Sequence, residues 1–195
     1  MSEPYDVVII GAGPGGAATA HYLALAGLRI LLLDKFNFPR DKTCGDGLTP
    51  RALRILDEMG LLDHIEEGSA RHRLVRFTAP NGREVNADIP MRDARYSYVE
   101  IIPRLALDHL IVERAIASGA TFESPARVTD IARNQDGVVV TAERGKRTTT
   151  YAARVAVIAT GANMALLLKL GLLKNQPEVD LGSPAHPHCR DQLRR

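Results

Sequence analysis

The feature that most constrains the fold is a glycine pattern close to the N-terminus. Gly11, Gly13 and Gly16 follow the spacing G-x-G-x-x-G, and residues 7–10 form an apolar, β-branched run just before them. Such a run is typical of a buried parallel strand. Residues 17–26 are expected to form a helix that ends at Gly27. The pattern therefore predicts a strand, a tight turn and a helix within the first thirty residues.

A second strand and an acidic residue complete the motif. Residues 29–33 are apolar enough for another buried strand, and Asp34 ends it 23 positions after Gly11. In a βαβ dinucleotide site the glycines permit the turn, the approach of a pyrophosphate and close helix packing. The helix N-terminus attracts the phosphates, and the acid accepts hydrogen bonds from a ribose. The alternative is a tight strand-to-helix turn that binds no ligand. The position of Asp34 at the end of the second strand, where the motif requires an acid, disfavours this alternative. The motif leaves NAD and FAD both open.

Composition excludes several classes of protein. The chain has 195 residues, of which 45% are hydrophobic and 25% charged, and its formal net charge is +2. These values are ordinary for one or at most two globular domains. The low net charge and the few aromatic residues argue against nucleic acid as a partner. Cys44 and Cys189 are far apart in the sequence, which disfavours a disulfide framework and favours a reducing compartment.

Targeting and membrane signals are weak. Glu3 and Asp6 precede an apolar run that breaks at Gly11, which is unlike a signal peptide. The most lipid-like segment, residues 165–173, is interrupted by a lysine and a glycine. A core helix is the favoured interpretation, with contact to a membrane surface or an apolar partner as the alternative. We therefore expect a cytoplasmic protein, with membrane association left open.

The region after the motif alternates between loops, helices and antiparallel strands. Residues 39–50 are expected to form a loop, and Thr49 and Pro50 then begin a helix that Gly60 ends. Asn81-Gly82 predicts a hairpin. A strand is expected over residues 96–102.

The remaining order predicts the fold class. Pro103 precedes an expected helix over residues 104–118, followed by a short β-meander over 121–153 and a buried strand over 154–162. We predict an α/β fold: a Rossmann-type domain over residues 1–174 with inserted antiparallel strands and a β-meander. Residues 175–195 hold three prolines and no amphipathic period, so an irregular tail is expected.

Three segments carry a resemblance to a known family. They are FPRDKTCGDGLTPRAL, IIPRLALDHLIVERAIASGA and VAVIATGAN. They resemble the geranylgeranyl reductase family of flavoproteins, which are relatives of the class A aromatic hydroxylases. The resemblance covers residues 4 to about 174 and implies that the nucleotide is FAD. Family members are much longer, so the resemblance also implies that most of the substrate domain lies outside this chain.

The resemblance assigns cofactor-binding roles by matched positions. Arg40 and Lys42 are implied to neutralise phosphate charge, although by themselves they would be solvated loop charges. The full implied set is Gly11, Ala12, Gly13, Pro14, Gly16, Asp34, Arg40, Lys42, Cys44, Gly45, Gly47, Arg104, Val128, Thr160 and Gly161. No catalytic residue is assigned. We expect no metal site, because His186, His188 and Cys189 stand in the proline-rich tail without a second cluster.

The implied activity is transfer of a hydride from reduced flavin to a carbon–carbon double bond of a polyprenyl or other lipid-like substrate. NAD(P)H or a ferredoxin-like protein would reduce the flavin again. Two alternatives stay open: a non-catalytic FAD-binding fragment or half of a split enzyme, and an FAD-dependent aromatic hydroxylase or halogenase.

Overall fold

A computed structural model describes residues 3–42, 46–65, 69–90 and 93–175. Its centre is a six-stranded sheet with the strand order β8-β2-β1-β11-β10-β9. Strands β8, β2, β1 and β11 run parallel, whereas β10 and β9 are antiparallel additions. In sequence order these strands are β1 (Tyr5–Ile10), β2 (Ile30–Leu33), β8 (Thr121–Glu123), β9 (Arg127–Arg133), β10 (Val138–Arg144) and β11 (Arg147–Ile158).

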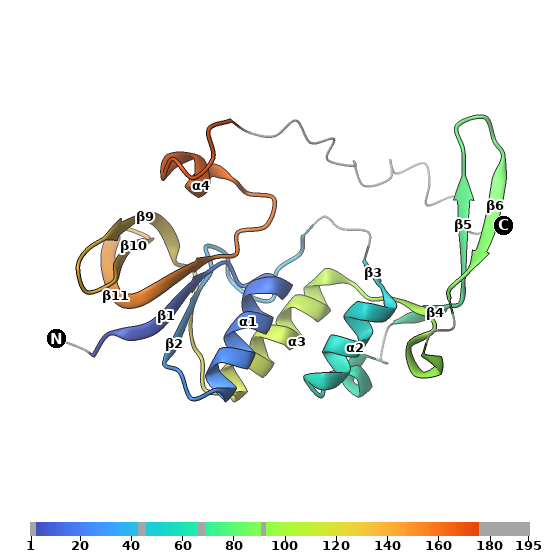
Figure 1. Cartoon of the computed structure of the whole chain (residues 1–195), viewed down its shortest axis with the longest axis horizontal. Helices are drawn as coiled ribbons and strands as arrows, with labels where there is room; N and C mark the ends of the chain where they lie inside the picture. Colours follow the sequence, from blue (N-terminus) through green and yellow to red (C-terminus); the bar gives the residue numbers. More distant parts are fainter. Residues whose placement is uncertain (1–2, 43–45, 66–68, 91–92, 176–195) are drawn as a thin grey trace.

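The central strands are buried on both faces, as their apolar sequences predict. Alternate residues of β1 belong to two different cores. Val7 and Ile9 pack with the helices α1 (Pro14–Leu25) and α3 (Arg104–Ala117), which cover one face of the sheet (Figure 1). Val8 and Ile10 pack against the antiparallel strands, which curl over the other face. The sheet is therefore covered on both faces at β1 and β2.

The helices begin and end largely where the sequence indicates. Helix α1 starts at Pro14, directly after the glycine turn, and Gly27 follows it with φ +81°. Helix α2 (Pro50–Glu58) has Thr49 as its N-cap, and the Thr49 hydroxyl accepts from the Ala52 N–H at 3.4 Å. A short helix, α4 (Ala165–Lys169), places the side chain of Leu166 in the core. These boundaries confirm the predicted caps and the predicted core helix.

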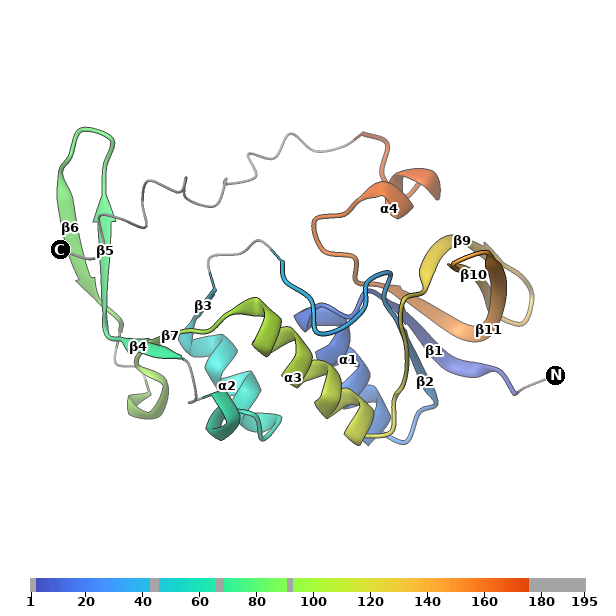
Figure 2. The same ribbon diagram turned by 180° about the vertical axis from the view of Figure 1, so that it is seen from behind.

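A second, smaller group of elements lies beside α2 and the N-terminal end of α3, away from the six-stranded sheet. It contains a three-stranded sheet of β3 (Gly47–Leu48), β7 (Val99–Ile101) and β4 (Ala70–His72), together with the 3₁₀ turns Leu62–Ile65 and Ala94–Tyr96. Beyond it the hairpin β5 (Leu74–Thr78) and β6 (Glu84–Asp88) projects away from the rest of the molecule (Figure 2). Asn81-Gly82 lies in its turn, as predicted.

Three predictions about strands are wrong in detail. The first strand of the expected meander over residues 121–153 is divided into β8, which pairs in parallel with β2, and β9, so the antiparallel meander consists of β9, β10 and β11. The strand expected over 154–162 is the second part of β11, which is continuous from residue 147. No glycine or proline interrupts it, so one strand pairs first with β10 and then with β1. The strand expected over 96–102 is shorter, because a 3₁₀ turn occupies its beginning.

Among the helices of the described residues, none is both long and apolar enough to cross a bilayer.

Candidate functional site

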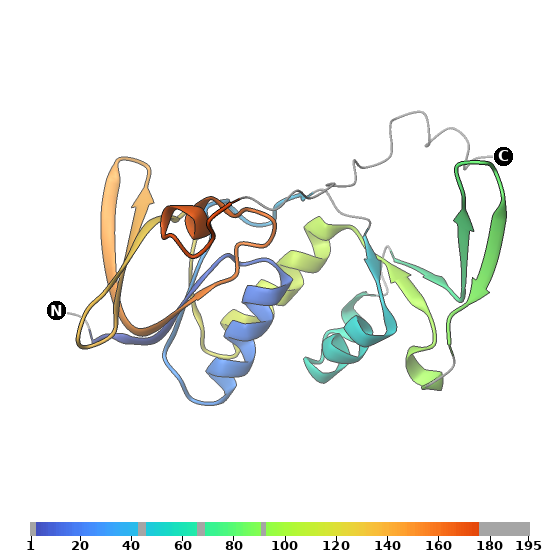
Figure 3. The same cartoon turned by 45° about the horizontal axis from the view of Figure 1, so that its top comes forward.

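A groove of about 840 Å³ lies where the carboxyl ends of β1, β2 and β11 meet the N-terminus of α1. In open α/β sheets this edge is where nucleotides bind. The strands supply its floor, the segment around Arg40 one wall, and β9 with α4 the opposite wall. Figure 3 shows α4 lying beside β9, above the ends of the parallel strands.

The glycine turn at the end of β1 has no room for side chains. Gly11 has φ +105°, and a Cβ atom there would lie 2.5 Å from the Ala159 oxygen. A Cβ on Gly16 would overlap the backbone oxygen of Gly11, which is why α1 can pack so closely on the strand. At Gly13 the nearest atom would be an Arg40 nitrogen at 3.8 Å, so this glycine leaves the groove open to a ligand. The three glycines thus have the separate roles that the motif predicts.

The Asp34 carboxylate ties the glycine turn to the end of β2. Its Oδ2 accepts from the Ala12 N–H at 2.8 Å, and its Oδ1 accepts from the Phe36 N–H at 2.9 Å. The residue is 6% exposed and lines the groove. Each carboxylate oxygen has a further lone pair, so Asp34 can accept from ribose hydroxyls while it holds the turn.

A buried ionic cluster lies behind the part of the groove next to Gly13. Asp108 on α3 is fully buried, and its carboxylate accepts two hydrogen bonds from Arg104, at 2.7 and 2.9 Å. An Arg40 nitrogen lies 3.5 Å from the same carboxylate and 4.0 Å from Asp34. The Arg40 guanidinium also lies over the ring of Phe38, 5.0 Å from its centroid. Asp108 thereby fixes both arginines that the resemblance implicates.

The groove is lined by more cations than anions. Lys35, Arg40, Lys42, Arg127 and Lys169 face it, against Asp34 and Asp41. The N-terminus of α1 adds its partial positive charge and free N–H groups. Across the groove, the Lys169 Nζ donates to the Thr129 oxygen at 2.6 Å, which joins α4 to β9. These charges suit a pyrophosphate.

The structure brings most of the predicted residues together. Gly11, Gly13, Pro14, Asp34, Arg40, Lys42, Val128, Thr160 and Gly161 line the groove. Ala12 and Gly16 stand directly behind it and shape the turn. Gly47 lies elsewhere, on β3, where it pairs with Ile101. Arg104 contacts Asp108 and is not among the groove-lining residues. Cys44, Gly45, His186, His188 and Cys189 lie outside the described residues.

Several residues in or directly behind the groove were missed by reasoning from the sequence. Asp108 had a usable signal, because its i,i+4 spacing from Arg104 favours an ion pair on one helix. Lys169 and Leu166 belong to the segment interpreted as a core helix, and nothing in that pattern indicates that its polar side faces a ligand. Within the described ranges no cluster of His, Cys, Asp and Glu side chains could hold a metal ion.

These features define a dinucleotide-binding domain, and comparison with known proteins identifies its class. The chain belongs to the FAD binding domain family, which it matches over residues 4–176. Menaquinone reductase of Mycobacterium tuberculosis (strain H37Rv) is 39% identical over 175 residues, which cover 88% of this chain and 41% of that protein. A 1H-pyrrole-2-carbonyl-[peptidyl-carrier protein] chlorinase of Pseudomonas fluorescens is 30% identical and covers 89% of this chain and 43% of its own length.

Solved structures agree with this assignment. The anhydrotetracycline hydroxylase OxyS of Streptomyces rimosus superposes with a TM-score of 0.73 at 30% identity, over 82% of this chain and 32% of its own. The chain thus spans less than half the length of the relatives that it matches.

The residues present fit FAD, the cofactor of this family. The glycine turn leaves a cradle that a Cβ would fill, and cations surround the place where a pyrophosphate would lie. In addition, the buried Arg40 Nε has no hydrogen-bond partner among the residues that the structure describes. A buried donor of this kind requires an acceptor, and a cofactor phosphate or ribose would supply one.

Proposed function

We propose that the chain holds FAD for a flavin-dependent hydroxylase or halogenase. The observation that carries the proposal is the open glycine turn with cations on both sides of the groove. Support for the class of enzyme comes from relatives, which include the chlorinase above, a tetracycline monooxygenase of Streptomyces rimosus and a rifampicin monooxygenase of Streptomyces venezuelae.

The work of this chain is to bind and orient the cofactor. Bound and reduced, FAD would supply the electrons with which such enzymes activate oxygen. The N-terminus of α1 would hold the pyrophosphate, with Lys42 and Lys169 neutralising its charge. Asp34 would accept the ribose hydroxyls. Asp108 would keep Arg40 and Arg104 in fixed orientations as the cofactor enters.

A reductase is the second candidate, and one observation favours it. At 39% identity, the M. tuberculosis relative named above is a menaquinone reductase. Under this alternative the electrons would go to a quinone or to a double bond of an isoprenoid substrate, with NAD(P)H as donor. A geranylgeranyl reductase is the narrower form of this alternative, and none of the relatives described above carries that name.

Titration with FAD tests the binding half of the proposal. Flavin fluorescence quenching should show saturable, stoichiometric binding by the 195-residue chain. Asp34→Asn should weaken FAD binding about tenfold. It removes the negative charge of the group that accepts the Ala12 N–H and would accept hydrogen bonds from the ribose hydroxyls. Asp41→Asn is the matched control. Asp41 also lines the groove, but its carboxylate accepts from the N–H of the adjacent Lys42 and does not hold the glycine turn. A folded chain that binds no FAD would refute the proposal.

Oxygen labelling separates the two candidate activities. The FAD-loaded chain is supplied with NADPH and ¹⁸O₂, together with a phenol, a pyrrole or menaquinone. Incorporation of ¹⁸O into the phenol, or halogenation of the pyrrole when chloride is present, supports the first candidate. A reduced menaquinone product without ¹⁸O supports the second candidate and contradicts the first.

A further inference from the structure

The hairpin β5–β6 carries an exposed apolar surface. Phe77 pairs directly with Val85, and Val75 pairs directly with Ala87. Residues that lie directly opposite each other are on the same side of a sheet, so these four side chains form one surface, the hairpin face. Phe77 and Val85 are each more than half exposed, and the hairpin projects away from the other labelled elements (Figure 3). The hairpin face is therefore accessible to a partner.

The opposite side of the hairpin is polar and pairs within itself. The Arg76 Nε donates to the Asn86 side-chain oxygen at 3.3 Å, and an Arg76 nitrogen lies 3.7 Å from the Glu84 carboxylate. Both acids of the hairpin, Glu84 and Asp88, alternate onto this side. The hairpin is therefore amphipathic, with one side suited to water and one suited to an apolar environment.

An arginine stands at each end of the hairpin face. The Ile89 N–H donates to the Arg73 oxygen at 2.9 Å, and the Ala79 N–H donates to the Arg83 oxygen at 2.8 Å. The pairing thus continues past both ends of the strands, and alternation places both arginines on the side of the hairpin face. Both are exposed, and neither guanidinium pairs with a carboxylate of the described residues. The hairpin face therefore has two cations and no anion.

This distribution of charge fits a lipid surface better than a second copy of the chain. Two hairpin faces aligned against each other would bring arginines next to arginines in either direction, because each end carries one. Like charges that meet in an interface are costly. In an anionic membrane the phosphates lie above the acyl chains, so long cationic side chains reach the phosphates while their apolar neighbours are buried.

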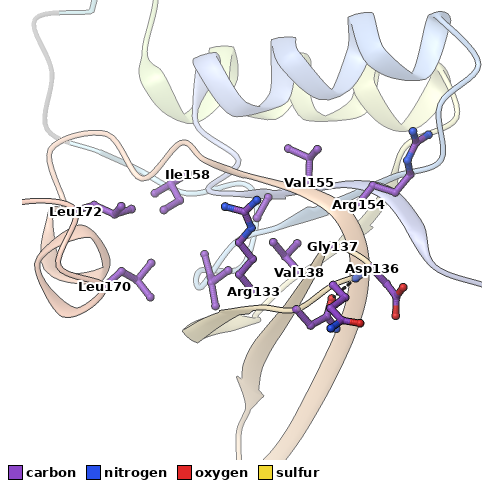
Figure 4. A pocket seen from close by; sticks show the side chains of 13 residues that line it. Arg133, Asp136, Gly137, Val138, Arg154, Val155, Ile158, Leu170 and Leu172 are labelled. Carbon is purple, nitrogen blue, oxygen red and sulfur yellow. Dashed lines mark hydrogen bonds between the residues drawn. The ribbon is translucent and has the colours of Figure 1, made fainter.

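The groove beside β11 is also partly apolar, but its shape and charge differ. It is a hollow of about 740 Å³. Figure 4 shows Ile158, Leu170 and Leu172 together at one end, and Arg154 near Asp136 at the other. A cation there has an acid beside it, and a flat bilayer does not enter a hollow. The hairpin face has neither restriction.

We propose that the hairpin face binds the surface of an anionic membrane. Phe77 and Val85 enter the interface between headgroups and acyl chains, and the two end arginines contact headgroup phosphates. The segment that the sequence leaves open to membrane contact, residues 165–173, is held in the core by Leu166, whereas the hairpin is exposed. The proposal does not depend on the enzyme class, and no residue from 73 to 89 lines the cofactor groove.

Sedimentation with vesicles tests the proposal first. The 195-residue chain should bind vesicles of equal parts phosphatidylglycerol and phosphatidylcholine about tenfold or more tightly than vesicles of phosphatidylcholine alone. Added salt should weaken this binding, because it screens the attraction between arginine and phosphate. Equal binding to the two kinds of vesicle, or binding to neither, would overturn the proposal.

Substitutions test the two components of the surface. Phe77→Ser removes an apolar group, and the double change Arg73→Gln with Arg83→Gln removes both cations. Each variant should bind the anionic vesicles about tenfold more weakly or worse. Leu25→Ser at an exposed position on α1, and Arg147→Gln at the exposed start of β11, are the matched controls. Controls that lose as much binding as the hairpin variants would overturn the assignment to the hairpin.

Tryptophan fluorescence locates the contact. The chain contains no tryptophan, so Phe77→Trp supplies a single probe on the hairpin face and Leu25→Trp supplies one on α1. With anionic vesicles the emission of Phe77→Trp should shift to shorter wavelength and be quenched by brominated acyl chains, because the indole leaves water. The emission of Leu25→Trp should not change. Binding to vesicles without a shift at Phe77→Trp would mean that another surface makes the contact, and would overturn the proposal.

Two measurements separate membrane binding from self-association and from FAD binding. Sedimentation equilibrium without lipid should show a monomer, and a dimer that Phe77→Ser dissociates would overturn the proposal in favour of a second copy. Phe77→Ser should bind FAD as the unmodified chain does, which also shows that the variant is folded. Loss of vesicle binding with FAD binding intact, or the reverse, therefore distinguishes failure of one proposal from failure of the other.

Discussion

Strands β1 and β2 of the parallel core and strands β5 and β6 of the projecting hairpin have similar lengths but opposite environments. Ile9 in β1 and Leu31 in β2 are 0% exposed, whereas Phe77 in β5 and Val85 in β6 are 61% and 63% exposed. Phe77 and Val85 form a cross-strand pair, and Val75 and Ala87 extend the same face. The hairpin therefore carries an apolar face with little to pack against.

The difference shows which part of the chain buries its own apolar surface. The core strands β1 and β2 have helices on one face and antiparallel strands on the other, so their apolar side chains are covered on both faces. An isolated two-stranded hairpin is marginally stable in water. We expect substitutions in the core unit to be costly and those in the hairpin to be nearly neutral in the chain alone.

The largest effect is expected at Asp108. Asp108→Ala removes the carboxylate that pairs with Arg104 and Arg40, and leaves two largely buried cations without it. Breaking a buried pair in this way costs about 3–5 kcal/mol of the free energy of unfolding. Urea denaturation measures it. Glu113→Ala, an exposed carboxylate on the same helix, is the control and should change stability by about 0.5 kcal/mol or less. Equal changes in the free energy of unfolding for the two variants would show that the ion pairs of Asp108 do not contribute to stability.

The next largest effect is expected at Gly16. Gly16→Ala forces a Cβ into the backbone oxygen of Gly11 and should cost about 3 kcal/mol. Gly15→Ala, one residue earlier, meets no atom within 4 Å and should be neutral or slightly stabilising. Thermal unfolding without FAD compares the two. If Gly15→Ala were as damaging as Gly16→Ala, close packing of α1 would not be the cause.

A smaller, pH-dependent effect is expected between α1 and α3. Burial lowers the pKa of His21, and the Arg114 charge lowers it further. Its Nδ1 lies 2.7 Å from the Ser118 hydroxyl. Since the unfolded chain then binds more protons, this contribution to stability is complete above pH about 6.5 and is lost as the pH falls below it. The melting temperature from pH 8 to 5 should therefore fall less for His21→Gln than for the unmodified chain. His72→Gln, at an exposed position on β4, should leave the profile unchanged.

The smallest effect is expected in the hairpin. Phe77→Ser removes one exposed cross-strand pair and should cost about 0.5 kcal/mol in the chain alone. Urea denaturation again measures it, with Val85→Ala as the companion change on the other strand. A loss above about 2 kcal/mol would mean that the hairpin is packed in solution, and would remove the contrast with the core.

Local patterns predicted the local structure well. The turn from β1 to α1, the Thr49 cap and the Asn81-Gly82 hairpin are each formed by residues that lie a few positions apart in the sequence. The separation of β8 from β9, the pairing of β8 with β2 and the continuity of β11 were not predicted, because which strands become neighbours depends on contacts distant in sequence.

The same limit applies to the site. The glycines and Asp34 were predictable because the phosphate turn and the ribose acceptor belong to one βαβ unit. Lys169 lines the groove from α4, and Asp108 holds the groove residue Arg40 from behind on α3; the sequences of both helices resemble those of ordinary surface helices.

The sequence by itself determined a βαβ nucleotide unit, since glycine spacing and apolar runs restrict the backbone locally. Only the tertiary structure decided which charged side chains line the groove and which strands become the neighbours of β11. Those properties arise from the packing of segments that are more than a hundred residues apart, and the free energy of that packing is not encoded in any single stretch of the chain.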